Sequence, residues 1–251
     1  MIETLNKRMG LPQSAYLGKR IYKKLFQENA KLGATDKKAL REDIDTITWE
    51  YTLKPVTIPI NPFSDEKHEY LEIAVIQANL TSRKRTERLA EIIHRAIPYP
   101  IVLLFVDGSY VRLSLATKRF SQAEKGVIVV DEFFATHWMD LGALETAEEP
   151  FLDSLAAKTL PHTDFKTFYD AIVDRVVALA CASRTGTYVI ERDAERVKSR
   201  RRMLAECREL EALIAEERTA LMREEQFNRK VDGNVRIKKM EQELARKVAA
   251  L

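Results

Sequence analysis

The sequence predicts an α+β fold, in which a small mixed β-sheet with packed helices is followed by a C-terminal helical coiled-coil tail. Three observations support this prediction. Residues 70–120 have the pattern of a strand, a helix and two further strands, and residues 165–179 repeat apolar side chains at helical spacing. From residue 191 onward the chain is highly charged and contains neither proline nor tryptophan. We expect a globular domain over residues 1–181 and a helical tail, or helical hairpin, over residues 182–251.

Residues 1–45 are predicted to be mostly helical. An apolar stripe at helical spacing, with basic residues between its members, supports this prediction. The apolar members are Leu17, Ile21, Leu25 and Phe26, and the basic ones are Lys19, Arg20, Lys23 and Lys24. The basic set could contact phosphates, although a solvated helix face is its more common origin. Residues 47–60 favour β-structure but contain Pro55 and Pro59, which indicates an edge strand, or two short strands with a bend, because proline cannot donate to a β-ladder.

The core of the predicted sheet lies in the middle of the chain. Strands are expected at residues 70–80, 101–106, 110–116 and 127–134. An amphipathic helix over residues 86–97 should end before Pro98, because the residue before a proline disfavours helical geometry. A turn at Asp107, Gly108 and Ser109 predicts a hairpin between the second and third of these strands.

Bulk composition indicates a globular protein of the cytoplasm. The chain has 251 residues, of which 45% are hydrophobic, enough for one sizeable core. It contains no apolar run long enough to span a bilayer and no signal-peptide pattern, so no membrane association is expected. Cys181 and Cys207 lack metal-like spacing and are predicted to be free thiols. The net charge of +3 is weak support for a nucleic-acid partner.

Apolar residues of the tail recur at heptad-like spacing, which predicts a coiled-coil seam. The seam comprises Met203, Leu210, Ile214, Leu221, Ile237, Met240 and Leu244. A single seam on a charged helix buries little surface, so it should pair with a second helix. Two arrangements remain open. The tail could turn at Asp232, Gly233 and Asn234 to form a hairpin, or it could continue as one helix that pairs with another chain, for example in a homo-oligomer.

The sequence contains no catalytic, cofactor or metal motif that would identify an enzyme. It lacks the phosphate-binding loop, the dinucleotide fingerprint, the CxxC pair and the GxSxG elbow, so a non-enzymatic role is favoured while activity stays open. Charged residues flank the central strands, namely Glu72, Asp107, Lys118 and Arg119. They raise the alternative of a metal-dependent nuclease, but the expected acid-x-Lys triplet is missing. His68, beside Glu66 and Glu69, is interpreted as an exposed loop residue rather than a metal ligand.

Two groups of residues remain as candidates for function. The first is a corner where the central helix meets the Pro-Tyr-Pro segment, and it comprises His94, Arg95, Tyr99, Lys118 and Arg119. The second is a basic set that could bind nucleic acid, comprising Arg83, Lys84, Arg85, Arg88, Arg200, Arg201 and Arg202. For the last three arginines, the flank of a coiled coil is the more common interpretation.

Several segments of the chain resemble DUF4391, a bacterial and archaeal family of unknown function. They are LGKRIYKKLFQENAKL, DIDTITWEYTLKPVTI, YLEIAVIQANL, AEIIHRAIPYPIVLLF, LSLATKRFS and EEQFNRKV. Members of that family are often encoded beside DNA methyltransferases and helicases of restriction-modification and phage-defence systems. The resemblance implies an accessory or scaffold protein that docks on such a partner, and it supplies no catalytic residues. Direct nucleic-acid binding and a divergent nuclease remain the alternatives.

Overall fold

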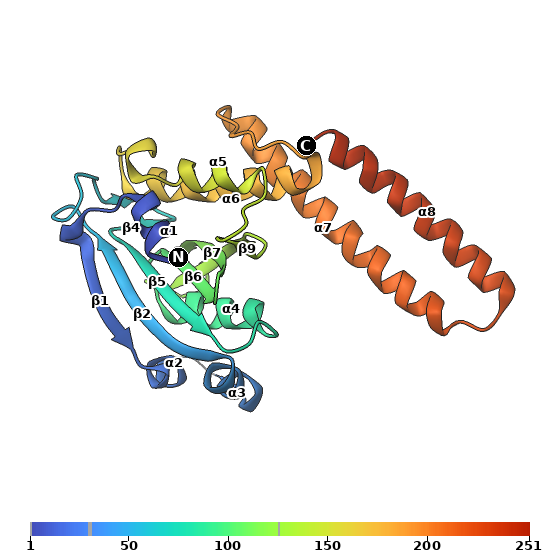
Figure 1. The fold of residues 1–251 in the computed structure, drawn as a ribbon, viewed down its shortest axis with the longest axis horizontal. Helices are drawn as coiled ribbons and strands as arrows, with labels where there is room; N and C mark the ends of the chain where they lie inside the picture. Colours follow the sequence, from blue (N-terminus) through green and yellow to red (C-terminus); the bar gives the residue numbers. More distant parts are fainter. Residues whose placement is uncertain (1, 30–31, 125) are drawn as a thin grey trace. The chain divides into compact units, whose positions relative to one another are not determined.

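The computed structural model describes residues 2–29, 32–124 and 126–251. The chain divides into a first compact unit that ends at Val176 and a second that begins at Val177. The predicted α+β class is confirmed, since the first unit combines helices with a mixed sheet and a long helical region follows it (Figure 1).

The first unit is built on a seven-stranded sheet with the order β1-β2-β5-β6-β7-β8, in which β9 also pairs with β7. Its strands are β1 (Tyr16–Ile21), β2 (Ile44–Leu53), β5 (Ile73–Leu80), β6 (Ile101–Asp107), β7 (Tyr110–Phe120), β8 (Ile128–Ala135) and β9 (Met139–Asp140). A separate two-stranded ribbon pairs β3 (Phe63–Ser64) with β4 (Glu69–Tyr70). Strands β5 and β6 are parallel, because helix α4 (Thr86–Ala96) carries the chain back between them, and the other pairs are antiparallel.

Helices cover both faces of this sheet. Besides α4, they are α1 (Ile2–Met9), α2 (Lys23–Asn29), α3 (Ala34–Glu42), α5 (Glu148–Ser154) and α6 (Phe165–Thr185), together with short 3₁₀ turns at Gln13–Ala15 and Ala157–Thr159. Helices α2, α3 and α4 lie on one face, whereas α5 and the part of α6 within the first unit lie on the other (Figure 1). The layers follow from the strands, since β5 and β6 are apolar on both faces and need cover on each.

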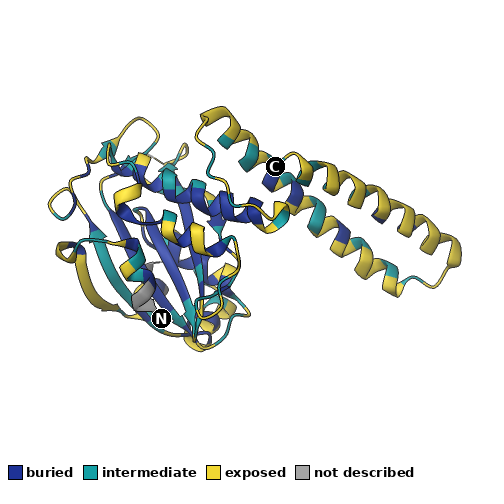
Figure 2. Cartoon of the chain, turned by 45° about the horizontal axis from the view of Figure 1, so that its top comes forward, coloured by how far each residue is buried: buried dark blue, intermediate teal, exposed yellow. Residues whose placement is uncertain are grey.

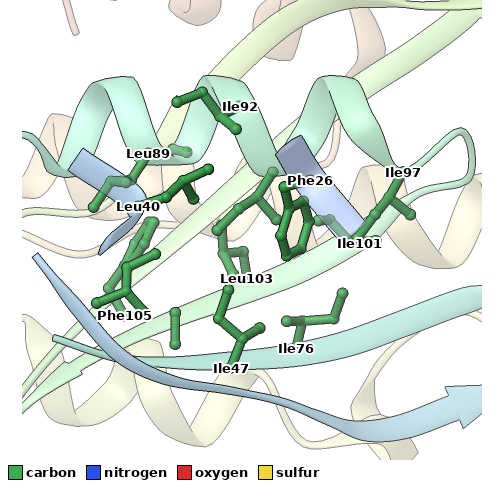
Figure 3. Packing of buried hydrophobic residues seen from close by; sticks show 14 of the residues in the cluster. Phe26, Leu40, Ile47, Ile76, Leu89, Ile92, Ile97, Ile101, Leu103 and Phe105 are labelled. Carbon is green, nitrogen blue, oxygen red and sulfur yellow. The ribbon is translucent and has the colours of Figure 1, made fainter. Parts of the chain in front are cut away.

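The face below α4 holds one continuous apolar cluster (Figure 3). Ile76 and Leu103 point into it from β5 and β6, and Leu89 meets them from α4. Phe26 and Leu40 anchor α2 and α3 in the same cluster. Burying each such side chain contributes about 1.5–3 kcal/mol. This cluster holds the short N-terminal helices against the sheet.

Two expectations for the N-terminal region are wrong. Residues 16–21 form the edge strand β1 rather than part of a helix, and β2 lies between β1 and β5 rather than at an edge. Gly18 has a φ of +59° where the β1–β2 register shifts, a left-handed conformation that glycine tolerates at a bulge. The hydrogen bonds that residues 16–21 form with β2 outweigh the short helical pattern of their apolar side chains. Pro55 and Pro59 follow the end of β2 at Leu53, so they do not interrupt its ladder.

The second unit contains a helical hairpin. Helix α7 (Ala194–Arg223) begins at Asp193, whose side chain accepts from the Arg196 backbone N–H, and α8 (Phe227–Ala249) runs back beside it. Three ion pairs join the helices, namely Glu206–Lys247 at 2.6 Å, Glu217–Arg236 at 3.2 Å and Arg218–Glu241 at 2.5 Å. Of the predicted seam, Ile214 and Ile237 are buried and the other members are half-buried, while most outward-facing residues are exposed (Figure 2).

The hairpin turns at residues 224–226 and not at Asp232–Asn234 as one alternative proposed. Gly233 lies inside α8 and is buried. A Cβ atom at this position would lie 2.6 Å from Cδ1 of Leu221 on α7. The glycine therefore permits a close approach of the two helices, because it has no Cβ atom. Glycine is also common in turns, which is why a turn here was one of the two arrangements that the sequence left open.

We expect the variant Gly233→Leu to destabilise the hairpin by about 1–3 kcal/mol, because its side chain must displace Leu221 in a packed interface. The measurement is urea-induced loss of helical circular dichroism. The matched control is Ala245→Leu, which enlarges an exposed position on the same helix and should change little. Equal midpoints for both variants would contradict the close approach.

Candidate functional site

Lys118 and the end of α4 form the most unusual polar arrangement in the first unit. The Lys118 side chain reaches from β7 to the last turn of α4, where its Nζ donates to the backbone carbonyls of His94, at 2.7 Å, and of Ile97. The residue is only 2% exposed, and this burial lowers its pKa to about 7. A lysine with such a pKa would suit proton transfer, but its donors are already used to satisfy helix-terminal carbonyls.

His94 is enclosed in the same region. Its Nε2 lies 3.1 Å from Ser114 Oγ on β7, its Nδ1 has no partner among the described residues, and its ring meets Phe133 edge-on. Burial, with a smaller contribution from nearby Lys118, lowers the pKa of His94 to about 3, so the imidazole is neutral at physiological pH. We interpret His94 and Lys118 as a structural tie between α4 and β7, because both side chains are enclosed.

The other members of the predicted corner lie apart from this tie. Arg119 pairs with Asp131 on β8 at 2.8 Å, and Arg95 is exposed on α4. Tyr99 packs against Trp49, with ring centroids 5.7 Å apart. The structure therefore brings His94 and Lys118 together but not the corner as a whole.

The basic residues at the start of α4 are engaged in ion pairs within the fold. Arg85 donates to Asp43 at 2.5 and 2.8 Å, and Arg88 donates to Asp36 at 2.8 and 2.7 Å. These bonds hold the pKa of both carboxyl groups below the usual range. Arg83 pairs with Asp107 at 2.6 Å and lies over the rings of Tyr110 and Trp138, whereas Lys84 is exposed. Most of this set is already neutralised.

The arginines of α7 are spread around the helix. Arg200 donates to the Val189 carbonyl at 3.0 Å, and Arg202 pairs with Glu206 at 3.0 Å. Arg201 is half-buried and engaged in a contact of its own. Nucleic-acid binding through these residues stays a prediction, and the contacts make it less favourable because each would have to be exchanged.

An apolar pocket of about 520 Å³ lies where β1, α2 and the end of α4 meet. We call it the Trp49 pocket. It is lined by Leu17, Lys19, Arg20, Ile21, Tyr22, Leu25, Trp49, Ala96, Ile97, Pro98 and Tyr99. Tyr22 is 72% exposed, Leu25 47% and Leu17 40%, so large apolar side chains gather here at the surface. Such a concentration next to a concave site is typical of an interaction surface.

The polar groups of the pocket are largely satisfied from within. Trp49 Nε1 donates to the Tyr51 carbonyl at 3.0 Å, and the Ile97 carbonyl accepts from Lys118. Burial, together with nearby Glu72, raises the pKa of Tyr99 to about 12, so its phenol stays protonated. The floor of the pocket can therefore accept apolar groups, and the polar side chains at its mouth are those of Lys19 and Arg20.

A cluster that could hold a metal ion lies elsewhere in the first unit. The ligand atoms of His137, Glu145 and Glu148 lie within 4.8 Å of one another, the one such group of three among the described residues. Buried Glu148 accepts from His137 Nε2 and from the Glu145 backbone N–H, both at 2.7 Å. These hydrogen bonds explain the cluster as a tie at the start of α5. No motif or residue spacing in the sequence predicted this cluster.

The residues of the nuclease alternative have separate partners. Glu72 pairs with Lys54 at 3.0 Å, Asp107 pairs with Arg83, and Lys118 serves α4. His68 contacts Asp65, with Nδ1 at 3.2 Å from the nearer carboxylate oxygen. In the part of the chain that the structure describes, these groups do not form a joint metal site.

The Trp49 pocket was not predicted from the sequence. Leu17, Ile21 and Leu25 were expected on one helix, whereas β1 ends before α2 begins and the pocket opens between the strand and the helix. The sequence offered no clear signal for the pocket, because the exposure of Tyr22 at this step is known only from the structure. Tyr99 is the one member of the predicted corner that lines the pocket.

None of the helices in the described residues is long and apolar enough to span a membrane.

Comparison with known proteins gives one match. A family model described as a domain of unknown function (DUF4391) matches residues 9–244, which covers nearly the whole chain and confirms the resemblance. No curated protein and no solved structure matches the chain.

Protonation of His94 should cost stability in acid. Its pKa is about 3 in the fold against an ordinary value of 6.5, so the unfolded chain binds the extra proton first as the pH falls. The contribution of neutral His94 to the free energy of unfolding is therefore fully present above pH 6.5 and is lost progressively towards pH 3. The unfolding free energy of the wild type should fall by about 1.4 kcal/mol per pH unit more steeply than that of His94→Gln. Urea titrations across this range test it, and parallel pH profiles would contradict it.

Proposed function

The chain belongs to the DUF4391 family, and from that premise we propose that it is a non-enzymatic accessory protein that docks on a larger protein partner through the Trp49 pocket. The observation that carries the proposal is the gathering of exposed apolar side chains around this pocket at the sheet edge. Leu17, Tyr22 and Leu25 remain in contact with water unless another molecule covers them, and covering them is favourable in proportion to the apolar area removed.

The polar groups of the first unit support a docking role over catalysis. The two groups whose pKa values are lowered most, His94 and Lys118, are enclosed and bonded to Ser114 and to backbone carbonyls. A catalytic group must reach its substrate within hydrogen-bond distance. Because these groups are enclosed, we place a divergent nuclease last among the candidate functions. Direct nucleic-acid binding comes second, because most of the basic residues it would use are already engaged in contacts within the fold.

We propose a DNA methyltransferase or a helicase of a restriction-modification or phage-defence system as the partner. The support is the gene neighbourhood implied by the family resemblance, and the pocket supplies a surface on which such a protein could dock.

A second contact surface is proposed on the hairpin. Phe227 is 77% exposed, Val231 45% and Val235 49%, and they follow one another at intervals of four residues on α8. The buried residues Gly233 and Ile237 lie on the opposite side of that helix. This outward stripe, rather than the seam satisfied within the hairpin, would mediate self-association.

Docking is tested by co-expressing the chain with a DNA methyltransferase or a helicase of a restriction-modification or phage-defence system and measuring the complex by size-exclusion chromatography with light scattering. We expect a complex with the wild type and its loss with Leu25→Glu, because a charge would enter the apolar surface. Val127→Glu is the matched control, since Val127 is 40% exposed on the approach to β8, and it should retain the complex. A complex that survives Leu25→Glu would refute docking through this pocket.

Self-association is tested by sedimentation of the purified chain. We expect a mass above that of the monomer, reduced to the monomer by deletion of residues 191–251 and by Phe227→Asp. Leu213→Asp, a change at a 49% exposed apolar residue of α7, should leave the mass unchanged. A wild-type chain that sediments as a monomer would exclude this part of the proposal.

A further inference from the structure

The charges at the mouth of the Trp49 pocket differ from those of the arginines around the start of α4. Lys19 and Arg20 line the pocket and are exposed. Neither side chain donates a hydrogen bond to, or forms an ion pair with, any residue that the structure describes. Arg83, Arg85 and Arg88, by contrast, each pair with an aspartate. The pocket therefore combines an apolar floor with two uncompensated positive charges.

Neighbouring groups of both signs lie close to this mouth. Desolvation is the main cause that lowers the pKa of Lys23, the Asp45 carboxylate opposes that shift, and Arg20 adds to it with a smaller effect, so Lys23 is partly compensated by Asp45. The carbonyl end of α4 would normally present negative partial charge to the pocket. Lys118 occupies two of these carbonyls, so the helix end repels an acidic ligand less.

The floor of the pocket selects for an apolar group. The Trp49 and Tyr99 rings line it together with Ile97 and Leu25, and the Trp49 N–H is bonded within the fold. A nucleobase would bring several hydrogen-bonding atoms into this space and leave them unpaired, at a cost of about 1–3 kcal/mol for each. A leucine or phenylalanine side chain has no such atoms. The lining therefore favours a protein side chain over a base.

The position of the pocket favours an extended segment. The consecutive residues Lys19 to Tyr22 line it, so it opens along the edge of the sheet, where β1 pairs only with β2. The bulge at Gly18 restricts regular pairing to the last part of β1. An added strand would thus gain few backbone hydrogen bonds and would depend on its side chains for affinity.

We propose that the Trp49 pocket binds an extended acidic segment of the partner protein, with one bulky apolar side chain in the pocket and carboxylates against Lys19 and Arg20. This inference rests on the proposed docking function and names the chemistry that the site recognises. The apolar anchor supplies most of the affinity, and the two cations select the charge of the segment.

The test selects a phage-displayed library of random dodecapeptides on the full-length protein, with counter-selection on Leu25→Glu. We expect enriched peptides with one large apolar residue flanked by Asp or Glu. Their affinity, measured by fluorescence anisotropy, should fall roughly tenfold in the double variant Lys19→Glu/Arg20→Glu and fall with added salt, because two exposed ion pairs are lost. The control Lys238→Glu/Lys239→Glu makes the same change of net charge on α8 and should bind as the wild type does.

The outcomes separate this inference from the docking function. Apolar peptides without acidic bias, or affinity unchanged in Lys19→Glu/Arg20→Glu, would overturn the acidic specificity and leave docking intact. If no peptide is enriched and the co-expressed partner also fails to bind, both are overturned. Pocket-dependent binding of a labelled single-stranded oligonucleotide, lost in Leu25→Glu while no peptide binds, would assign the site to nucleic acid and overturn the inference.

Discussion

The hydrogen bonds from Lys118 to the end of α4 connect the parts of the first unit that matter most for a functional interpretation. Helix α4 links the two parallel central strands, and its last carbonyls would be unsatisfied in the interior without a donor. A lysine from β7 supplies that donor at the cost of burying an amine. The bond fixes the segment Ile97 to Tyr99, which forms one wall of the Trp49 pocket. The residue that most resembles a catalytic group thus has a clear structural task.

The ion pairs of individual charged residues are more informative about this protein than its net charge. The arginines before and within α4 fasten it to the loop before β2, to α3 and to the end of β6 through Asp43, Asp36 and Asp107. The hairpin helices are joined in the same way by three ion pairs. A net charge of +3 therefore says little about partners. The informative cations are Lys19 and Arg20, which have no such partner among the described residues and border an apolar surface.

The periodic parts of the fold were predictable because their patterns are local. The helix α4, the hairpin of β6 and β7, and β8 follow from alternation, helical spacing and a turn at Gly108. Residues 16–21 were predicted wrongly as helix, because the apolar residues of this short segment also recur at helical spacing. Their strand structure depends on pairing with β2. Gly233 was ambiguous for a related reason, because a glycine permits both a turn and a close helix contact, and Leu221 decides between them.

The sequence by itself determined the fold class, the family and the presence of two helical segments able to pair through apolar residues. Composition and periodicity carry that information along the chain. Only the tertiary structure decided which polar residues are available to other molecules. His94 and Lys118 became enclosed, Arg85 and Arg88 found aspartates distant in sequence, and Trp49 met Tyr99 beside an open strand edge. Burial and pairing depend on contacts between segments far apart in the chain, and a linear pattern does not encode their distances.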